Sequence, residues 1–206
     1  MTSPFIIHTL GRSRTAWLSE FLTYGPWFVE REIAIGMRSL DDVANWFACP
    51  NVGTVETAAC YGHWLLRQAV PGIREAVVRR PVEAVIQSSL AAGEAVGITY
   101  DESHLRRLLT YGERMLTKIS ARPGVLTLDY ADLETEAGCR AIFEFCLETS
   151  FNREWWLRWR DVNVQISLLD LVRYYAANLA EITTWKQTAK AELRHLVRTG
   201  KLKELV

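Results

Sequence analysis

The residues best suited to chemistry stand between the first apolar run of the chain and the helical periodicity that follows it. This segment, Gly11–Thr15, reads Gly-Arg-Ser-Arg-Thr and comes directly after the apolar run Phe5–Thr9. A turn from a strand into a helix directs backbone N–H groups and the helix N-terminus at one point, which is what a phosphate needs. The hydroxyls of Ser13 and Thr15 can add donors, and arginines can form paired hydrogen bonds with anionic oxygens. The segment therefore predicts an anion-binding loop, against the alternative of an ordinary turn with surface arginines.

The same loop disfavours one class of phosphate-binding protein. The loop of magnesium-dependent ATP hydrolases needs a second glycine and a lysine before its Ser or Thr. The residues that follow Gly11 supply neither. A magnesium-ATP hydrolase is therefore not the expected function.

A second pair of arginines, Arg79 and Arg80, stands at another junction between a strand and a helix. They follow the expected strand Arg74–Val78, whose last three residues are apolar, and precede Pro81, a residue that suits the first turn of a helix. In a parallel sheet the carboxyl ends of the strands are where ligands bind. The two loops together could hold two phosphates of one nucleotide, whereas the second pair alone is more often a solvated surface feature.

The elements that must position these loops alternate between short strands and helices, as in βαβ units with a parallel sheet. The expected strands are Phe5–Thr9, Trp27–Ile35, Asn51–Val55, Arg74–Val78 and Gly124–Leu128. The expected helices are Thr15–Tyr24, Ser39–Phe47, Thr57–Val70, Pro81–Ala92, Asp101–Ser120, Leu133–Leu147 and, after a purely helical stretch from Arg153, Gln165–Thr199. We predict an α/β fold with a mostly parallel sheet of four to five strands and a helical C-terminal third. The 206 residues are expected to form one domain, with an α/β core over 1–150 and a helical extension over 151–206.

Composition limits the partners and the compartment. The 24 Lys and Arg residues balance 24 Asp and Glu residues, and a neutral chain is a poor match for nucleic acid or an anionic membrane. The four cysteines form no C-x-x-C pair and have no histidine at ligand spacing, which disfavours a metal site or disulfides. With neither a signal segment nor a membrane-spanning run, we expect a cytoplasmic protein with no nucleic-acid or membrane partner.

Three motifs of the sequence resemble those of the sulfotransferases. Gly11–Leu18 is similar to their loop for a 5′-phosphosulfate, of the type P-[KR]-S-G-[ST]-T-W-L, and Val78–Glu83 is similar to their 3′-phosphate motif, Arg-Asp-Pro before a helix. A weaker third match is Tyr130–Leu133 ahead of Ile142–Phe145, similar to the family's Tyr-Glu-Asp-Leu and the helix after it. The order and spacing of the motifs agree with the family, and beyond about Phe151 nothing matches.

This resemblance implies a three-layer, P-loop-like fold that binds 3′-phosphoadenosine 5′-phosphosulfate (PAPS) without a metal. The implied activity is transfer of the sulfuryl group to a hydroxyl or amine of a small molecule or sugar. Arg12 takes the place of the family's catalytic Lys or Arg and would stabilise negative charge on the leaving oxygen, and Arg79 would bind the 3′-phosphate. The implied cofactor-binding residues are Gly11, Arg12, Ser13, Arg14, Thr15, Ala16, Trp17, Arg79, Gln87 and Ser88.

The sequence departs from the family pattern at two of these positions. Arg14 stands where the family usually has glycine, which bears on the tightness of the loop. The family's 3′-loop serine, eight residues after the arginine, falls on Gln87, and Ser88 comes one residue later. Either Gln87 substitutes for the serine, or the start of the helix is shifted.

An acceptor hydroxyl should also be helped by a general base within hydrogen-bond reach. Glu30 and Glu32 lie at the end of the second expected strand, where related sulfotransferases often carry an acid or a His-Glu pair. Glu56 and His63 are the other candidates. We assign the role to Glu32, against the alternative of a plain surface carboxylate.

The run Trp155–Trp159 contains three tryptophans in five positions. It is typical of a cap over the core or of a dimer or lid surface, so a homodimer is one open alternative. Two other functions also stay open on the same fold. One is a catalytically silent module that binds a nucleotide or a partner, and the other is a P-loop-type phosphotransferase.

Overall fold

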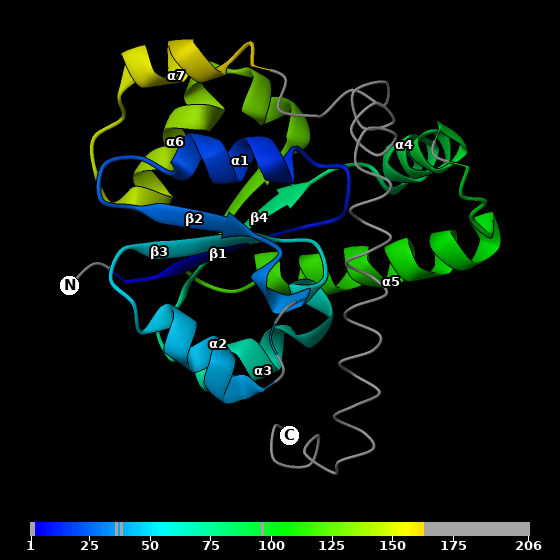
Figure 1. The fold of residues 1–206 in the computed structure, drawn as a ribbon, viewed down its shortest axis with the longest axis horizontal. Helices are drawn as coiled ribbons and strands as arrows, with labels where there is room; N and C mark the ends of the chain where they lie inside the picture. The colour runs from blue at the N-terminus through cyan, green and yellow to red at the C-terminus, as the bar shows by residue number, and fades with distance from the viewer. Residues whose placement is uncertain (1–2, 36, 38, 96, 163–206) are drawn as a thin grey trace, which may run out of the picture. The chain divides into compact units, whose positions relative to one another are not determined.

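Five parallel strands form the centre of the computed structural model (Figure 1), which describes residues 3–35, 37, 39–95 and 97–162. The strands are β1 (Phe5–Thr9), β2 (Phe28–Arg31), β3 (Val52–Glu56), β4 (Arg74–Arg79) and β5 (Leu126–Asp129). They are ordered β2-β3-β1-β4-β5, and each neighbouring pair is parallel. The predicted helix over 165–199 and most of the predicted extension lie outside the described residues.

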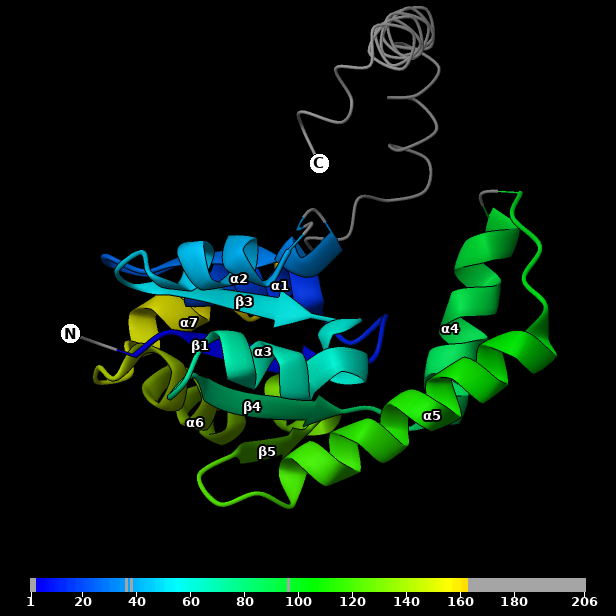
Figure 2. The ribbon, with the colours of Figure 1, turned by 90° about the horizontal axis from the view of Figure 1, so that it is seen from below.

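Helices cover both faces of this sheet, so that the described part of the chain has three layers (Figures 1 and 2). One face carries α1 (Thr15–Leu22), α6 (Glu136–Leu147) and α7 (Arg153–Trp159). The other carries α2 (Leu40–Phe47), α3 (His63–Ala69) and α5 (Glu102–Ser120), with α4 (Val82–Ala95) packed beside α5. Short 3-10 helices η1 (Ile33–Ile35), η2 (Ala59–Gly62) and η3 (Tyr130–Glu134) join them. The predicted α/β class with a parallel sheet is confirmed.

Strand β1 is buried on both faces because it lies in the middle of the sheet. Phe5 and Ile7 pack toward α1 and α6, whereas Ile6 packs toward α2 and α3, and all three side chains are fully buried. This is the burial that a continuous apolar run predicts for a central parallel strand. The central position of β1 fixes the loop that follows it at the middle of one sheet edge.

The tryptophan-rich helix α7 covers the core on the α1 side. Trp156 is buried with α1 and α6, and Trp155 and Trp159 pack against the same cluster. The indole of Trp17 donates to the Trp159 carbonyl at 2.8 Å, and that of Trp155 donates to the Phe21 carbonyl at 2.8 Å. Within the described residues the segment therefore acts as a cap that holds α1, the helix that follows the predicted anion loop.

Most predicted elements have boundaries that differ by a few residues in the structure, and three of them are instructive. The strand predicted over Trp27–Ile35 ends at Arg31, because Glu32 adopts a left-handed backbone (φ 58°) and a 3-10 turn follows. The helix predicted over Thr57–Val70 begins as a 3-10 turn, and its α-helical part starts at His63. The helix predicted from Leu133 starts only at Glu136, because the Thr135 hydroxyl caps it by accepting from the Gly138 N–H at 3.0 Å.

Replacing Gly138 with alanine is expected to destabilise the fold by about 1–3 kcal/mol, because an added methyl group overpacks a tight contact. A Cβ atom at this position would lie 2.2 Å from the carbonyl oxygen of Asp132, which is backbone and cannot turn away. Gly62→Ala is the matched control, since nothing lies within 4 Å of its Cβ position. Urea unfolding of both variants measures the difference, and equal midpoints would contradict the assigned contact.

Candidate functional site

The site lies at the carboxyl ends of β1 and β4, where neighbouring connections leave the sheet toward different faces. After β1 the chain passes to α1 on one face, whereas the neighbouring strand β3 leads to α3 on the other face (Figure 1). Helix α4, which follows β4, packs against α5 through Val85 and Ile86. Such a point, at which neighbouring connections diverge, is the usual ligand crevice of an open parallel sheet. The predicted anion loop and the predicted arginine pair both fall there.

The loop between β1 and α1 is tight although it has a single glycine. Arg12 and Arg14 adopt left-handed backbones, with φ of 62° and 58°. A side chain in this conformation costs about 1–2 kcal/mol, and such strain tends to gather at binding sites. Arg14 thus takes up the conformation that glycine adopts easily, so the departure from the family pattern at this residue does not open the loop.

Helix α1 presents its free N-terminal N–H groups to this loop. No described side chain caps it at Arg14, and its first turn holds no acidic residue. The unpaired N–H groups and the positive end of the helix dipole therefore face the loop, as an anion site requires. The Trp17 side chain is buried and the Ser13 hydroxyl donates to the Gly11 carbonyl at 3.4 Å. Trp17 can accordingly offer a ligand its backbone alone.

Two arginines from different elements meet at the aromatic ring of Tyr130. The Arg80 guanidinium lies 4.6 Å from the ring centroid and that of Arg14 lies 5.7 Å from it. Arg14 also donates to the Leu133 carbonyl at 3.3 Å, and Arg80 donates to the Arg12 carbonyl. These contacts hold two positive charges beside the loop, and each ring contact is favourable in itself.

Arg79 does not share this side of the sheet. Consecutive residues of a strand point to opposite faces, so Val78 packs with α1 and α6 while Arg79 points toward α5. There its guanidinium forms an ion pair with Glu113 and lies 3.4 Å from the Thr117 hydroxyl. The structure therefore splits the arginine pair. Arg80, which sequence reasoning did not assign to binding, is the member that reaches the loop.

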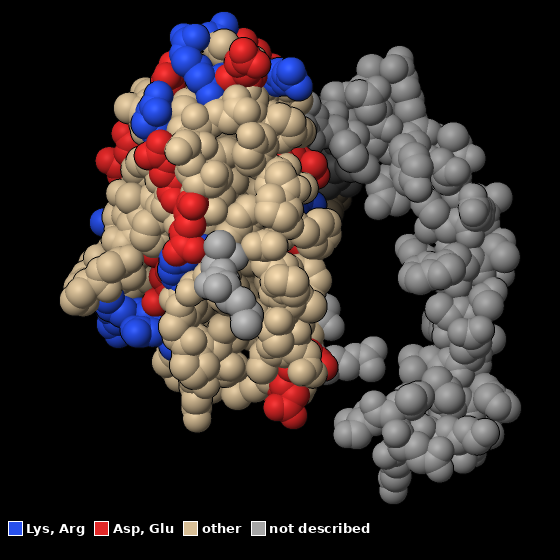
Figure 3. All heavy atoms as spheres, turned by 90° about the vertical axis from the view of Figure 1, so that its left-hand side faces the viewer, with Lys and Arg blue, Asp and Glu red and all other residues tan. Residues whose placement is uncertain are grey.

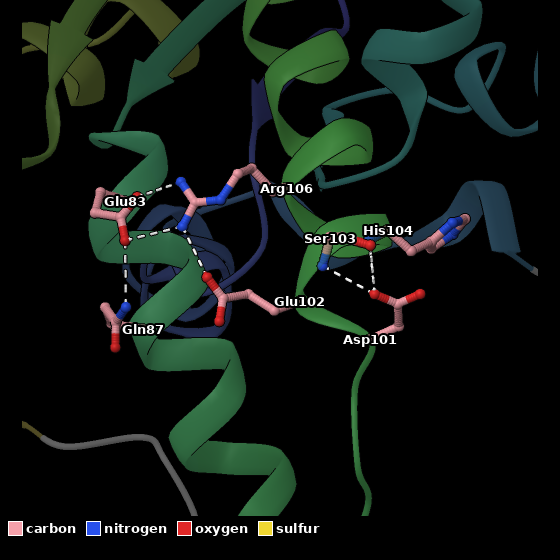
Figure 4. Close-up of polar contacts among 7 residues, drawn as sticks. All are labelled: Glu83, Gln87, Asp101, Glu102, Ser103, His104 and Arg106. Atoms are coloured by element: carbon pink, nitrogen blue, oxygen red, sulfur yellow. Dashed lines mark hydrogen bonds and ion pairs between the residues drawn. The ribbon is translucent and has the colours of Figure 1, made fainter.

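Ser88, rather than Gln87, faces the loop from α4. The Arg12 Nε donates to the Ser88 hydroxyl at 3.2 Å. The Gln87 amide instead donates to Glu83 at 3.2 Å, and Glu83 accepts from Arg106 at 2.6 Å (Figure 4). Successive residues of a helix are about 100° apart around its axis, because 3.6 residues make a turn. Of the two residues, Ser88 is therefore the one that contacts Arg12, whereas Gln87 points to a neighbouring part of α4.

Two carboxylates lie at the carboxyl ends of β2 and β3, Glu32 directly after β2 and Glu56 as the last residue of β3. Glu56 is buried, with Oε1 accepting from the Thr54 hydroxyl at 2.7 Å and from the Ala34 N–H at 3.3 Å. Burial raises the pKa of Glu56, and the charge of Glu32 raises it further. Glu32 is half-buried and accepts from the Thr57 hydroxyl at 3.1 Å.

The other two base candidates are placed differently. Glu30 is exposed and accepts from the Arg31 N–H at 2.9 Å. His63 begins α3, and its Nδ1 lies 2.6 Å from the Arg122 guanidinium. Burial and the charge of Arg122 lower the pKa of His63. The structure therefore brings Glu32 and Glu56 together at the sheet edge and assigns His63 to a contact with Arg122.

Four arginines lie at the carboxyl ends of β1 and β4, namely Arg12, Arg14, Arg79 and Arg80. Two of them have acidic partners there, Arg14 with Glu134 at 3.6 Å and Arg79 with Glu113. The opposite end of the molecule, where β1 begins, shows acidic and basic atoms side by side (Figure 3). Among the described residues no helix is long and apolar enough to cross a membrane, and no group of three His, Cys, Asp or Glu residues could hold a metal ion.

Comparison with known proteins relates this chain to solved structures. No protein-family model and no curated protein matches the sequence. A sulfotransferase from Alicyclobacillus acidocaldarius has a similar structure, with a TM-score of 0.52 at 12% identity, over 90% of this chain and 96% of that one. A gluconokinase from Sinorhizobium meliloti aligns with a TM-score of 0.45 at 12% identity, over 71% of this chain and 90% of that one. The chain thus shares its fold with a sulfotransferase.

Proposed function

We propose that this chain is a sulfotransferase that binds PAPS at the Gly11–Trp17 loop and transfers the sulfuryl group to a hydroxyl or amine. A small molecule or a sugar is the proposed acceptor. The main support for this proposal is the uncapped N-terminus of α1, which lies next to a loop that contains Arg12 and Arg14. The fold shared with a sulfotransferase supports it.

The residues present fit the 5′-end of such a nucleotide. The N–H groups of Thr15, Ala16 and Trp17 at the start of α1 would bind the phosphate oxygens, and Ser13 and Thr15 would add hydroxyls. Arg14 and Arg80, both held against Tyr130, would add charge-assisted hydrogen bonds. Backbone N–H groups, hydroxyls and guanidinium groups would then all donate hydrogen bonds to the anionic oxygens.

The 3′-phosphate is assigned to Arg79 with help from Ser88. Arg79 is paired with Glu113 in the described structure, so a phosphate would have to replace that carboxylate. The two side chains are 37% and 24% exposed, and an ion pair as exposed as this contributes only about 0–1 kcal/mol. A phosphate with two charges is therefore able to compete for Arg79.

The chemistry divides between one arginine and one carboxylate. When bound, PAPS supplies an activated sulfuryl group. Arg12 stabilises negative charge on the leaving phosphate oxygen, and it does so as a fixed charge, because an arginine does not give up its proton in proteins. Glu32 accepts the acceptor proton, since it is half-buried and reachable, whereas burial raises the pKa of Glu56 and favours its neutral form.

Thermal unfolding with three ligand conditions tests the proposed class. A ligand that binds the folded state raises its stability in proportion to the logarithm of ligand concentration over Kd. We expect 3′,5′-ADP to raise Tm without magnesium, and ADP with magnesium to leave it unchanged. Stabilisation by magnesium-ADP alone would favour a phosphotransferase and refute the proposal. Binding of 3′,5′-ADP with no transfer to any acceptor would favour the silent module.

A further inference from the structure

Two fully buried polar side chains lie side by side beneath the loop. His8 on β1 and Glu56 on β3 are register partners in the parallel pair, and their exposed fractions are 0% and 1%. Each has one buried atom without a hydrogen-bond partner among the described residues, Nδ1 of His8 and Oε2 of Glu56. Buried polar atoms are hydrogen-bonded in the great majority of cases. Two unpaired atoms on neighbouring residues of adjacent strands therefore need a physical explanation.

Both side chains point to the same face of the sheet. Ile6 and Val52 pack together on the α2 and α3 side. Because side chains alternate with a period of two, His8 shares the face of Ile6, and Glu56 shares that of Val52. Adjacent strands are about 4.8 Å apart. Glu56 Oε1 faces Ala34 and His8 Nε2 faces Glu75, so the two unpaired atoms are left on the sides of their groups that can turn toward each other. At this strand spacing a side-chain rotation or one bridging water would join Oε2 to Nδ1.

The other ring nitrogen of His8 fixes which atom carries its proton. His8 Nε2 lies 3.2 Å from Glu75, whose other oxygen lies 2.7 Å from Arg122 on the turn after α5. Burial opposes ionisation of Glu75, but the hydrogen bond from His8 and the charges of Arg122 and Arg67 lower its pKa. Burial lowers the pKa of His8, which keeps the ring neutral. A neutral ring that donates from Nε2 to a carboxylate has a bare acceptor at Nδ1.

Glu56 carries a polar atom, Oε2, that lacks a hydrogen-bond partner among the described residues. Its Oε1 already accepts from the Thr54 hydroxyl and the Ala34 N–H. Burial raises the pKa of Glu56 and the charge of Glu32 adds to this, whereas hydrogen bonds from Thr54, Ala34 and Ile33 lower it; the net shift is upward, toward the protonated form. Since Oε1 is used twice as an acceptor, the proton belongs on Oε2. Protonated Oε2 of Glu56 needs an acceptor, and bare Nδ1 of His8 needs a donor. These are the two buried atoms that have no partner among the described residues.

We propose that Glu56 donates the proton on Oε2 to Nδ1 of His8, forming a buried proton-holding pair that keeps Glu56 neutral beside Glu32. The charged and titratable groups around the pair are Glu75, Arg122, His63 and Arg67 on the His8 side, and Glu32 on the Glu56 side. Two adjacent carboxyl groups resist simultaneous ionisation, so a neutral Glu56 removes a competing negative charge from beside Glu32. Glu56 and His8 are then positioning residues for Glu32. This consequence for Glu32 rests on the proposed function, whereas the hydrogen bond itself does not.

Nitrogen-15 NMR of the histidine side chains tests the pair without any nucleotide or turnover. Substituting the four histidines with glutamine, one at a time, assigns the signals, and three of these variants identify His8 by elimination if His8→Gln does not fold. At neutral pH we expect His8 to be neutral and protonated at Nε2. Its Nδ1 signal should be displaced upfield from that of a free imidazole nitrogen, as for an acceptor in a hydrogen bond.

Two substitutions of Glu56 make the test specific. Glu56→Gln keeps a donor that can reach Nδ1, so the displaced signal should remain. Glu56→Leu removes the donor at similar size, so Nδ1 should shift to the free-acceptor position while His63 keeps its signal. A proton on Nδ1, a charged ring at neutral pH, or a His8 signal indifferent to Glu56→Leu would each overturn the proposal. None of these outcomes depends on whether the protein transfers a sulfuryl group.

Discussion

Replacing Arg12 with alanine is expected to lower turnover by about 10²–10³-fold, which is the usual loss when one group that stabilises developing charge is removed. Its side chain is exposed and its described hydrogen bond is to Ser88, so the fold should not depend on it. The N–H groups of α1 and the guanidinium groups of Arg14 and Arg80 stay in place. Affinity for 3′,5′-ADP should therefore change far less than turnover.

The measurement is the rate of transfer of a labelled sulfuryl group, to an acceptor or to water, together with the Kd of 3′,5′-ADP. Arg12→Lys keeps the charge and should retain part of the rate. Arg107→Ala removes an exposed arginine of α5 and serves as the matched control. Unchanged turnover in Arg12→Ala would remove the catalytic role assigned here to that residue.

Replacing Arg79 with alanine is expected to weaken binding selectively, for ligands that carry a 3′-phosphate. One charge-assisted hydrogen bond contributes roughly 1.5–3 kcal/mol, which corresponds to about 10–100-fold in Kd. The loss should therefore appear with 3′,5′-ADP and not with 5′-AMP. Arg80→Ala should weaken both ligands, because Arg80 lies at the loop, where the shared 5′-phosphate would bind.

A substitution of Glu113, the ion-pair partner of Arg79, should have the opposite effect on nucleotide binding. Because it pairs with Arg79 in the described structure, Glu113→Gln should free that guanidinium and tighten 3′,5′-ADP binding by up to about fivefold, the equivalent of an exposed ion pair. Glu102→Gln is the matched control, since Glu102 is an acid of the same helix that pairs with Arg106. Equal effects of Arg79→Ala on both nucleotides, or weaker 3′,5′-ADP binding in Glu113→Gln than in Glu102→Gln, would contradict the assignment of the 3′-phosphate to Arg79.

The architecture could be predicted from the sequence because buried strands appear as short apolar runs and helices as periodic apolar residues. The run Phe5–Thr9 is a fully buried strand with the predicted boundaries, and the turn after it enters a helix at Thr15 as expected. Five parallel strands follow from short apolar runs separated by helical segments. Boundaries moved where side chains cap a helix, as at Thr135, or where the backbone turns left-handed, as at Glu32.

The site was less predictable because it depends on which way each side chain points. Arg79 and Arg80 are neighbours in sequence but face opposite sides of the sheet. Side chains of consecutive strand residues point to opposite faces, and this rule applied to the end of β4 could have separated them. Likewise, the choice between Gln87 and Ser88 depends on the rotation of α4.

His8 gave no signal in the sequence. Its hydrogen-bond partner, Glu75, comes from β4, which is distant in the sequence. Arg122 and His63, which interact with it electrostatically, come from a distant turn and a distant helix. No local spacing encodes contacts between residues so far apart in the chain. The buried polar groups beneath the loop therefore become visible only when the sheet is assembled.

Calorimetric titration with 3′,5′-ADP in the presence of a chelator tests the central claim most directly, that the Gly11–Trp17 loop binds such a nucleotide without a metal. Unaltered protein and the double variant Arg14→Ala with Arg80→Ala should be titrated side by side, with far-ultraviolet circular dichroism to verify that both are folded. We expect 3′,5′-ADP to bind at one site in the unaltered protein and not to bind the folded double variant. Absence of binding in the unaltered protein, or equal binding in both, would contradict this claim.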